Sequence, residues 1–124
     1  MPRRFRMLAG CCVATACLAA GATGAAASGP TAHAARSCTT PDYPGSGYFY
    51  SITVRNVGCR KGRKVTLAHY RCRTESGRKG RCHHRVLRYR CRERRYAVIP
   101  TQYSAKVTCR RGDRRVIYRY QQNT

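Results

Sequence analysis

The stretch that decides the fold runs from Tyr48 to Gly58, with the sequence YFYSITVRNVG. Side chains two residues apart line the same face of a strand, and β-branched and aromatic residues favour pleated backbone. One face of this stretch would carry Tyr48, Tyr50, Ile52 and Val54, and the other Phe49, Ser51, Thr53 and Arg55. We therefore expect a strand with an apolar core face, ended by the turn residues 56–58.

The next segment, residues 59–72, fits two structures. An i, i+3, i+4, i+7 stripe typical of a helix is formed by Val65, Ala68, His69 and Cys72. Alternation of Val65, Leu67 and His69 would also fit a strand. We choose the helix, because the basic residues 60–64 would then lie in solvent near its start.

Three further strands follow the helix. The first covers residues 86–91, with Leu87, Tyr89 and Cys91 on one face, and a loop containing Pro100 comes after it. The second and third form a hairpin around the turn residues 110–113, with core faces made of Tyr103, Ala105, Val107 and Cys109, then Val116, Tyr118 and Tyr120. The expected fold is α+β, a β-α-β-β-β domain at 48–124 with a four-stranded, mainly antiparallel sheet and one helix on one face.

Residues 1–34 have the plan of a secretory signal peptide. An arginine cluster at positions 3–6 precedes an uncharged run, residues 7–27. Small residues at the −3 and −1 positions place the cleavage before Ala35, and a cut before Ser28 is the alternative. A Pro- and Gly-rich arm, residues 35–47, would follow.

Two alternatives use the same leader. Cys11 ends a lipobox-like sequence, Leu8-Ala9-Gly10-Cys11, which would make the protein a lipoprotein anchored at Cys11. The uncharged run is also about long enough to cross a bilayer, but it consists mostly of Ala and Gly. We expect a secreted, extracellular protein without an integral membrane span in its mature chain.

Cysteine content supports export. Of the 9 cysteines, three lie in the leader, and the remaining six are Cys38, Cys59, Cys72, Cys82, Cys91 and Cys109. In an oxidising compartment these six are expected to form three disulfides, each worth about 2–4 kcal/mol. Fifteen pairings are possible, and Cys72 with Cys82 is the most favourable local pair because a short polar turn separates them. A zinc site at Cys72, Cys82, His83, His84 and Cys91 is the rival, but its spacing fits no paired knuckle.

Charge is the strongest compositional signal. Lys and Arg number 26 and Asp and Glu 4, and three of the cations belong to the leader, which leaves a net charge of +19. The sheet face away from the helix would carry Arg55, Arg88, Arg90, Lys106, Arg115 and Arg119. We take Arg55, Arg88, Arg90, Lys106 and Arg119 as the candidate anion-binding residues, because a positive surface concentrates polyanions and Arg binds phosphate in bidentate fashion.

The expected partners are anionic polymers of the cell envelope, with nonspecific binding of nucleic acid in vitro. A purely structural secreted module without a ligand is one alternative. Another is a cationic toxin, either antimicrobial or ribonuclease-like. For the ribonuclease-like toxin, the types of residue needed as general acid and base are supplied by His69, His83, His84, Glu75 and Glu93. No nucleophile elbow, phosphate loop or metal-binding helix motif is present in the sequence, and no apolar patch is separated from the charge. We therefore expect no enzyme and no cofactor.

Several runs of the mature chain resemble a group of small secreted, Cys-containing proteins of high-GC Gram-positive bacteria. These runs are Ile52–Cys59, Gly62–Val65, Val107–Gly112 and Tyr120–Asn123. They correspond to a strand that ends in Cys, a helix, and a late Cys-x-x-Gly hairpin. The resemblance implies the same architecture and export, and it implies no activity.

Overall fold

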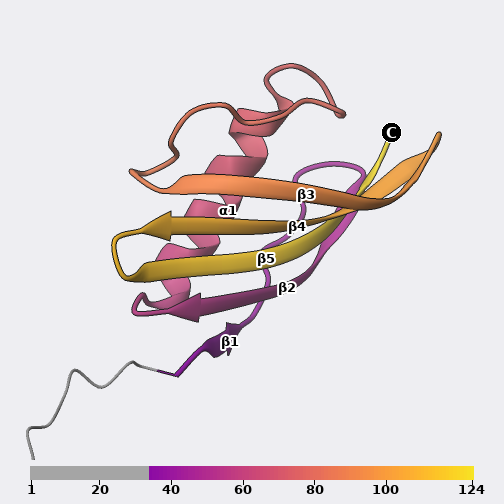
Figure 1. Ribbon diagram of the computed structural model, residues 1–124. Coiled ribbons are helices and arrows are strands. Elements are labelled where there is room, and N and C mark those ends of the chain that lie inside the picture. Colours follow the sequence, from indigo (N-terminus) through magenta and orange to yellow (C-terminus); the bar gives the residue numbers. More distant parts are fainter. Residues whose placement is uncertain (1–33) are drawn as a thin grey trace, which may run out of the picture.

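The computed structural model describes residues 34–124 (Figure 1). The expected signal peptide, its alternative cut before Ser28 and the lipidation alternative at Cys11 lie outside the described residues.

The described part folds as one antiparallel sheet with a helix packed across one face (Figure 1). Its elements are β1 (Arg36–Cys38), β2 (Gly47–Arg55), α1 (Cys59–Thr74), β3 (Arg90–Ile99), β4 (Gln102–Arg111) and β5 (Arg114–Asn123). The strands pair antiparallel in the order β1-β2-β5-β4-β3. The α+β class and the single helix are confirmed, whereas the sheet has five strands rather than the expected four.

Two strand predictions were wrong in extent. Residues 36–38, expected within a loose arm, form β1, with Arg36 opposite Val54 of β2. The strand expected at 86–91 begins only at Arg90 and continues to Ile99, and residues 86–89 form a tight bridged turn before it. The polar run after Arg90 hides the strand, because its helix-facing positions carry Glu93 and Arg95 instead of apolar residues.

The core face of β2 also differs from the expected one. Tyr48 and Tyr50 are 45% and 47% exposed, whereas Phe49, expected to point outward, is buried. A bulge between Phe49 and Ser51 shifts the pairing with β5 by one residue. Such a bulge exchanges the faces on either side of it, so the alternation from Tyr48 to Val54 does not describe a single face.

Helix α1 meets the sheet through the predicted stripe. Val65, His69 and Cys72 are buried and Ala68 is half-buried. The start of the helix lies very close to β2, because an added Cβ on Gly62 would come within 2.6 Å of Cγ1 of Val54. A glycine at this position therefore sets the distance between the helix and the sheet.

Three disulfides crosslink the described residues: Cys38–Cys59, Cys72–Cys82 and Cys91–Cys109. The expected pair Cys72–Cys82 is confirmed, and it closes the loop after α1 onto the end of the helix. Cys38–Cys59 joins β1 to the start of the helix, and Cys91–Cys109 joins two directly opposite residues of β3 and β4. All six cysteines expected to be crosslinked are therefore paired.

Replacing Gly62 with Ala tests the close approach of α1 to β2. An exposed helical Gly→Ala change normally stabilises a protein by about 1 kcal/mol. Here we expect Gly62→Ala to lower the free energy of unfolding by about 1–3 kcal/mol, because the new methyl group overlaps Val54. Urea unfolding followed by circular dichroism measures the change.

Val54→Ala provides the matching control, since it removes the methyl group that Gly62→Ala would meet. The double variant should be more stable than the sum of the two single changes by at least about 0.5 kcal/mol. Additive free energies would contradict the contact.

Candidate functional site

The sheet face opposite α1, here called the open face, carries eight cations on four neighbouring strands. On β4 and β5 the residues that face the helix are buried, and the residues between them point to the other side. The pairing of β2, β3, β4 and β5 extends this alternation across the sheet. The cations of the open face are Arg55, Arg90, Arg92, Arg94, Lys106, Arg110, Arg115 and Arg119.

Strand register places four of these cations in one line across the sheet. Arg90 of β3 lies opposite Arg110 of β4, Arg110 opposite Arg115 of β5, and Arg115 opposite Arg55 of β2. Neighbouring strands lie about 4.8 Å apart, and like charges directly opposite each other destabilise a sheet. These four residues, here called the arginine row, therefore concentrate positive charge in one line across the sheet.

A second row of cations lies about 13 Å further along the strands, four residues at about 3.3 Å each. It consists of Arg94 on β3, Lys106 on β4 and Arg119 on β5, each opposite the next, and ends at Ser51 on β2. Between the two rows, Arg92 lies opposite Thr108. The positive charge thus covers a band of the open face rather than one spot.

A hollow of about 550 Å³ occupies the β3–β4 part of this band. Around it lie Arg90, Arg92, Glu93, Arg94, Lys106, Thr108 and Arg110. Five of the seven lining residues are cations and one is a hydroxyl, while the side chain of the seventh, Glu93, is only 6% exposed. This lining suits an anion with several oxygen atoms.

Carboxylates do not balance these cations. Within residues 34–124, the ion pairs join only Glu93 to Arg81 and to Arg95. Glu93 lies opposite Val107, which faces the helix, and its side chain is only 6% exposed. The acid closest in sequence to the cation rows is therefore engaged on the opposite side of the sheet.

Four of the five candidate anion-binding residues lie in the band: Arg55, Arg90, Lys106 and Arg119. Arg88 does not, because it lies in the turn before β3 with a φ of 69°. Sequence reasoning missed Arg92 and Arg94, since it ended the strand at Cys91, and Arg110, since it assigned this residue to a turn. Arginines at the alternating positions 90, 92 and 94 were the signal that could have shown them.

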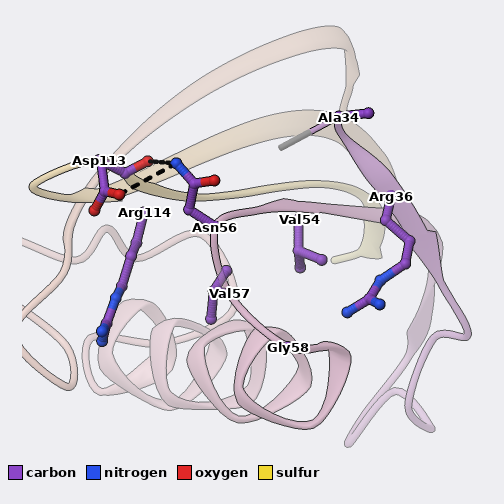
Figure 2. Close-up of a pocket in the computed structure, with 8 residues that line it drawn as sticks. All are labelled: Ala34, Arg36, Val54, Asn56, Val57, Gly58, Asp113 and Arg114. Atoms are coloured by element: carbon purple, nitrogen blue, oxygen red, sulfur yellow. Dashed lines mark hydrogen bonds between the residues drawn. The ribbon is translucent and has the colours of Figure 1, made fainter. Parts of the chain in front are cut away.

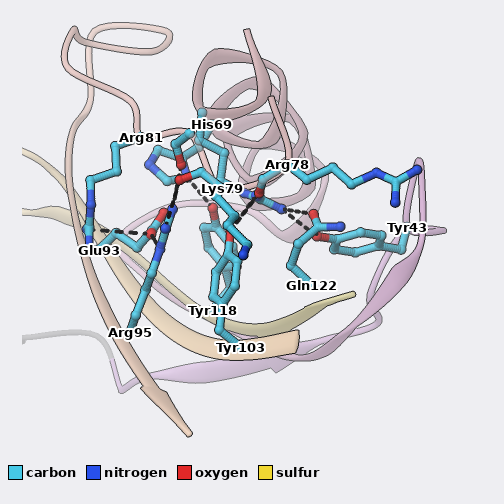
Figure 3. A network of polar contacts seen from close by, with 12 residues as sticks. Tyr43, His69, Arg78, Lys79, Arg81, Glu93, Arg95, Tyr103, Tyr118 and Gln122 are labelled. Carbon is cyan, nitrogen blue, oxygen red and sulfur yellow. Dashed lines mark hydrogen bonds and ion pairs between the residues drawn. The ribbon is translucent and has the colours of Figure 1, made fainter. Parts of the chain in front are cut away.

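A buried polar network lies on the side of the sheet that faces α1 (Figure 3). The Nδ1 atom of His69 and the hydroxyl of Tyr118 share a hydrogen bond, and His69 is 1% exposed. Burial lowers the pKa of His69 to about 4, against the opposing influence of Glu93. The ring is therefore neutral at physiological pH and inaccessible to a polymer.

The residues considered for a ribonuclease-like site are not brought together. His69 is buried, whereas His83 and His84 are exposed in the loop before β3. Glu75 is exposed at the end of α1, and Glu93 is held by arginines. His84 approaches the Cys72 sulfur at 3.6 Å, but this sulfur and that of Cys82 are bonded to each other, so neither is a thiolate ligand for zinc.

A second hollow, of about 650 Å³, lies between β1, the end of β2 and the start of α1 (Figure 2). Arg36 and Arg114 contribute cations to its lining, but Asp113 contributes a carboxylate. The amide of Asn56 donates to this carboxylate at 3.2 Å. This hollow therefore carries compensated charge, and the open face is the better candidate for a functional site.

The chain matches no family model, no curated protein and no solved structure. Within residues 34–124, no helix has the length and apolar character needed to cross a bilayer.

The lowered pKa of His69 predicts a pH dependence of stability. The unfolded chain binds a proton near the ordinary pKa of 6.5, but the folded chain only near about 4. Protonation therefore favours unfolding, and stability should be complete above pH 6.5 and fall between pH 6.5 and 4, by on the order of 3 kcal/mol. Tyr118, Glu93 and Arg73 are the polar and charged groups that act on this ring.

Urea unfolding at a series of pH values measures this effect. His69→Gln should flatten the decline in that window, whereas replacing both exposed histidines, His83 and His84, with Gln should leave it unchanged. The same decline in His69→Gln would assign the dependence to other groups.

Proposed function

We propose that this protein is an exported module that binds anionic polymers of the cell envelope through its open face. The observation that supports this is the band of cations without carboxylate partners among residues 34–124, above all the arginine row. An oxygen-rich polyanion that lies along the rows would replace the repulsion between neighbouring strands with attraction.

The residue type favours phosphate or carboxylate as the group that is bound. Seven of the eight cations of the open face are arginines. A guanidinium is planar, remains charged, and matches two oxygens of a phosphate or carboxylate at once. Because regular strands hold the backbone of these residues, their spacing is fixed before a ligand arrives.

The shape of the face favours an extended polymer over a small molecule. The cations spread over four strands, and on β3, β4 and β5 they spread over about 13 Å along the strand, since four residues separate the two rows at about 3.3 Å each. A small anion would contact only a few of them, whereas a flexible chain of phosphates could follow both rows. The three disulfides fit an oxidising compartment, so envelope polymers are the partners that we propose.

A salt series tests the proposal. Binding to poly(glycerol phosphate) should weaken steeply with NaCl concentration, since each neutralised phosphate adds about 0.7–0.9 to the slope of log K against log salt. Replacing Arg55, Arg90, Arg110 and Arg115 with Gln should reduce that slope by about three units. Fluorescence anisotropy of a labelled polymer measures both quantities.

A second quadruple variant separates position from net charge. Arg60, Lys64, Arg71 and Arg78 are exposed outside the open face, and their replacement with Gln removes the same charge. This control should retain most of the slope. Equal losses in the two variants would show that the binding depends on net charge alone and would reject the open face as a site.

A further inference from the structure

The hairpin between β3 and β4 ends in an exposed apolar segment. Residues 96–100, Tyr-Ala-Val-Ile-Pro, are here called the apolar tip. Tyr96 is 44% exposed, Val98 65% and Ile99 50%. This hairpin lies at the end of the sheet where β5 also ends (Figure 1), and the backbone N–H of Thr124 donates to the carbonyl of Thr101 there. The exposed fractions show that about half of each of these three side chains lies in solvent.

The backbone of the tip holds these side chains outward. Pairing with β4 is shifted between Tyr96 and Ile99, which marks a bulge, and Ala97 within it has a φ of 49°. A left-handed conformation is unfavourable for a residue with a Cβ. The tip therefore contains a β-bulge, and a bulge changes the direction in which the neighbouring side chains point.

Tyrosines continue this apolar end across the open face. The register runs from Tyr96 through Ser104 and Gln121 to Tyr48. The rings of Tyr48 and Tyr50 lie edge to face at 4.6 Å, and both hydroxyls donate to Oε1 of Gln121. The open face is therefore divided along its strands into an aromatic and apolar end and a cationic end.

A membrane with anionic lipids matches these two ends, because its acyl chains are apolar and its headgroups are negatively charged. Aliphatic side chains partition into the boundary of the acyl chains, tyrosines settle at the headgroup level, and cations attract anionic headgroups. The second row, Arg94–Lys106–Arg119, is the cationic row next to the tip. Sequence reasoning found no apolar patch separated from the charge, and this was wrong because the bulged tip lay in an expected loop.

We infer that the apolar tip and the adjoining cations dock this protein on anionic lipid membranes, with Val98 and Ile99 inserted at the headgroup boundary. The inference rests on the proposed function for its electrostatic part and adds a distinct surface for the apolar part. A second copy of the chain is a poor occupant, because face-to-face association would bring the two cationic bands together.

The insertion is tested with a fluorescent residue, since the sequence contains no Trp. Val98→Trp is mixed with vesicles of phosphatidylglycerol and phosphatidylcholine in equal amounts, and with vesicles of phosphatidylcholine alone. Its emission should shift to shorter wavelength only with the anionic vesicles. Leu87→Trp is the matched control, because Leu87 is 43% exposed but lies in the turn before β3; its emission should not shift. An unshifted Val98→Trp emission would overturn the insertion.

Vesicle cosedimentation and polymer binding then separate this inference from the proposed function. The double variant Val98→Ser, Ile99→Ser should lose at least about tenfold in affinity for the anionic vesicles while its affinity for poly(glycerol phosphate) stays unchanged. Unchanged vesicle affinity would overturn the docking and leave the proposed function standing. If the arginine-row variant keeps its salt slope for the polymer, the proposed function fails, and the tip variant still decides the docking. Loss of polymer binding in the tip variant would assign the tip to the polymer site and reject a separate membrane surface.

Discussion

One buried cation holds the layers of this domain together. Arg73, near the end of α1, is 1% exposed, and its guanidinium donates to the hydroxyls of Tyr43 and Tyr103 and to Oε1 of Gln122. It lies 4.3 Å from the ring centroid of Tyr120. A buried charge is costly unless hydrogen bonds and dipoles surround it, and here phenol oxygens and an aromatic face do so. Burial raises the pKa of Tyr43 and of Tyr120, so these phenols stay neutral and the cation is held without a counter-charge from them.

Arg73 and Gly62 together fix the position of the helix. Gly62 sets the distance to β2 at the start of α1, and Arg73 connects its end to β4, β5 and the arm that contains Tyr43. Glu93 supports the same side of the sheet, because it holds Arg95, whose guanidinium also donates to the carbonyls of Lys79 and Gly80. Internal positive charge is thus matched by internal tyrosines and by the one acid of the strands. The open face receives none of this compensation.

Hydrophobic periodicity in the sequence was sufficient to predict the elements whose buried residues recur at a regular helical or strand spacing. The stripe through Val65 and His69 predicted the helix, and the alternation in β4 and β5 predicted their buried faces. It failed for β3, because polar Glu93 and Arg95 stand at helix-facing positions. Arg95 donates there to two loop carbonyls, and Glu93 pairs with Arg81 and Arg95 through Oε1. It failed at Tyr50 because a bulge is a property of the pairing with β5. Arg73 had no sequence signal, since nothing distinguishes it locally from the other arginines around it.

The disulfide between β3 and β4 lies next to a pair of like charges on the same two strands. Cys91 and Cys109 lie directly opposite each other, one step from the pair Arg90 and Arg110 and one step from the pair Arg92 and Thr108. Like charges on β3 and β4 repel each other at the pair Arg90–Arg110, and β3 is an edge strand with a neighbour on one side only. A covalent bond at this step keeps the strands together where electrostatics would separate them. The disulfide therefore supports the pairing of β3 with β4 at the step next to the like-charged pair Arg90–Arg110.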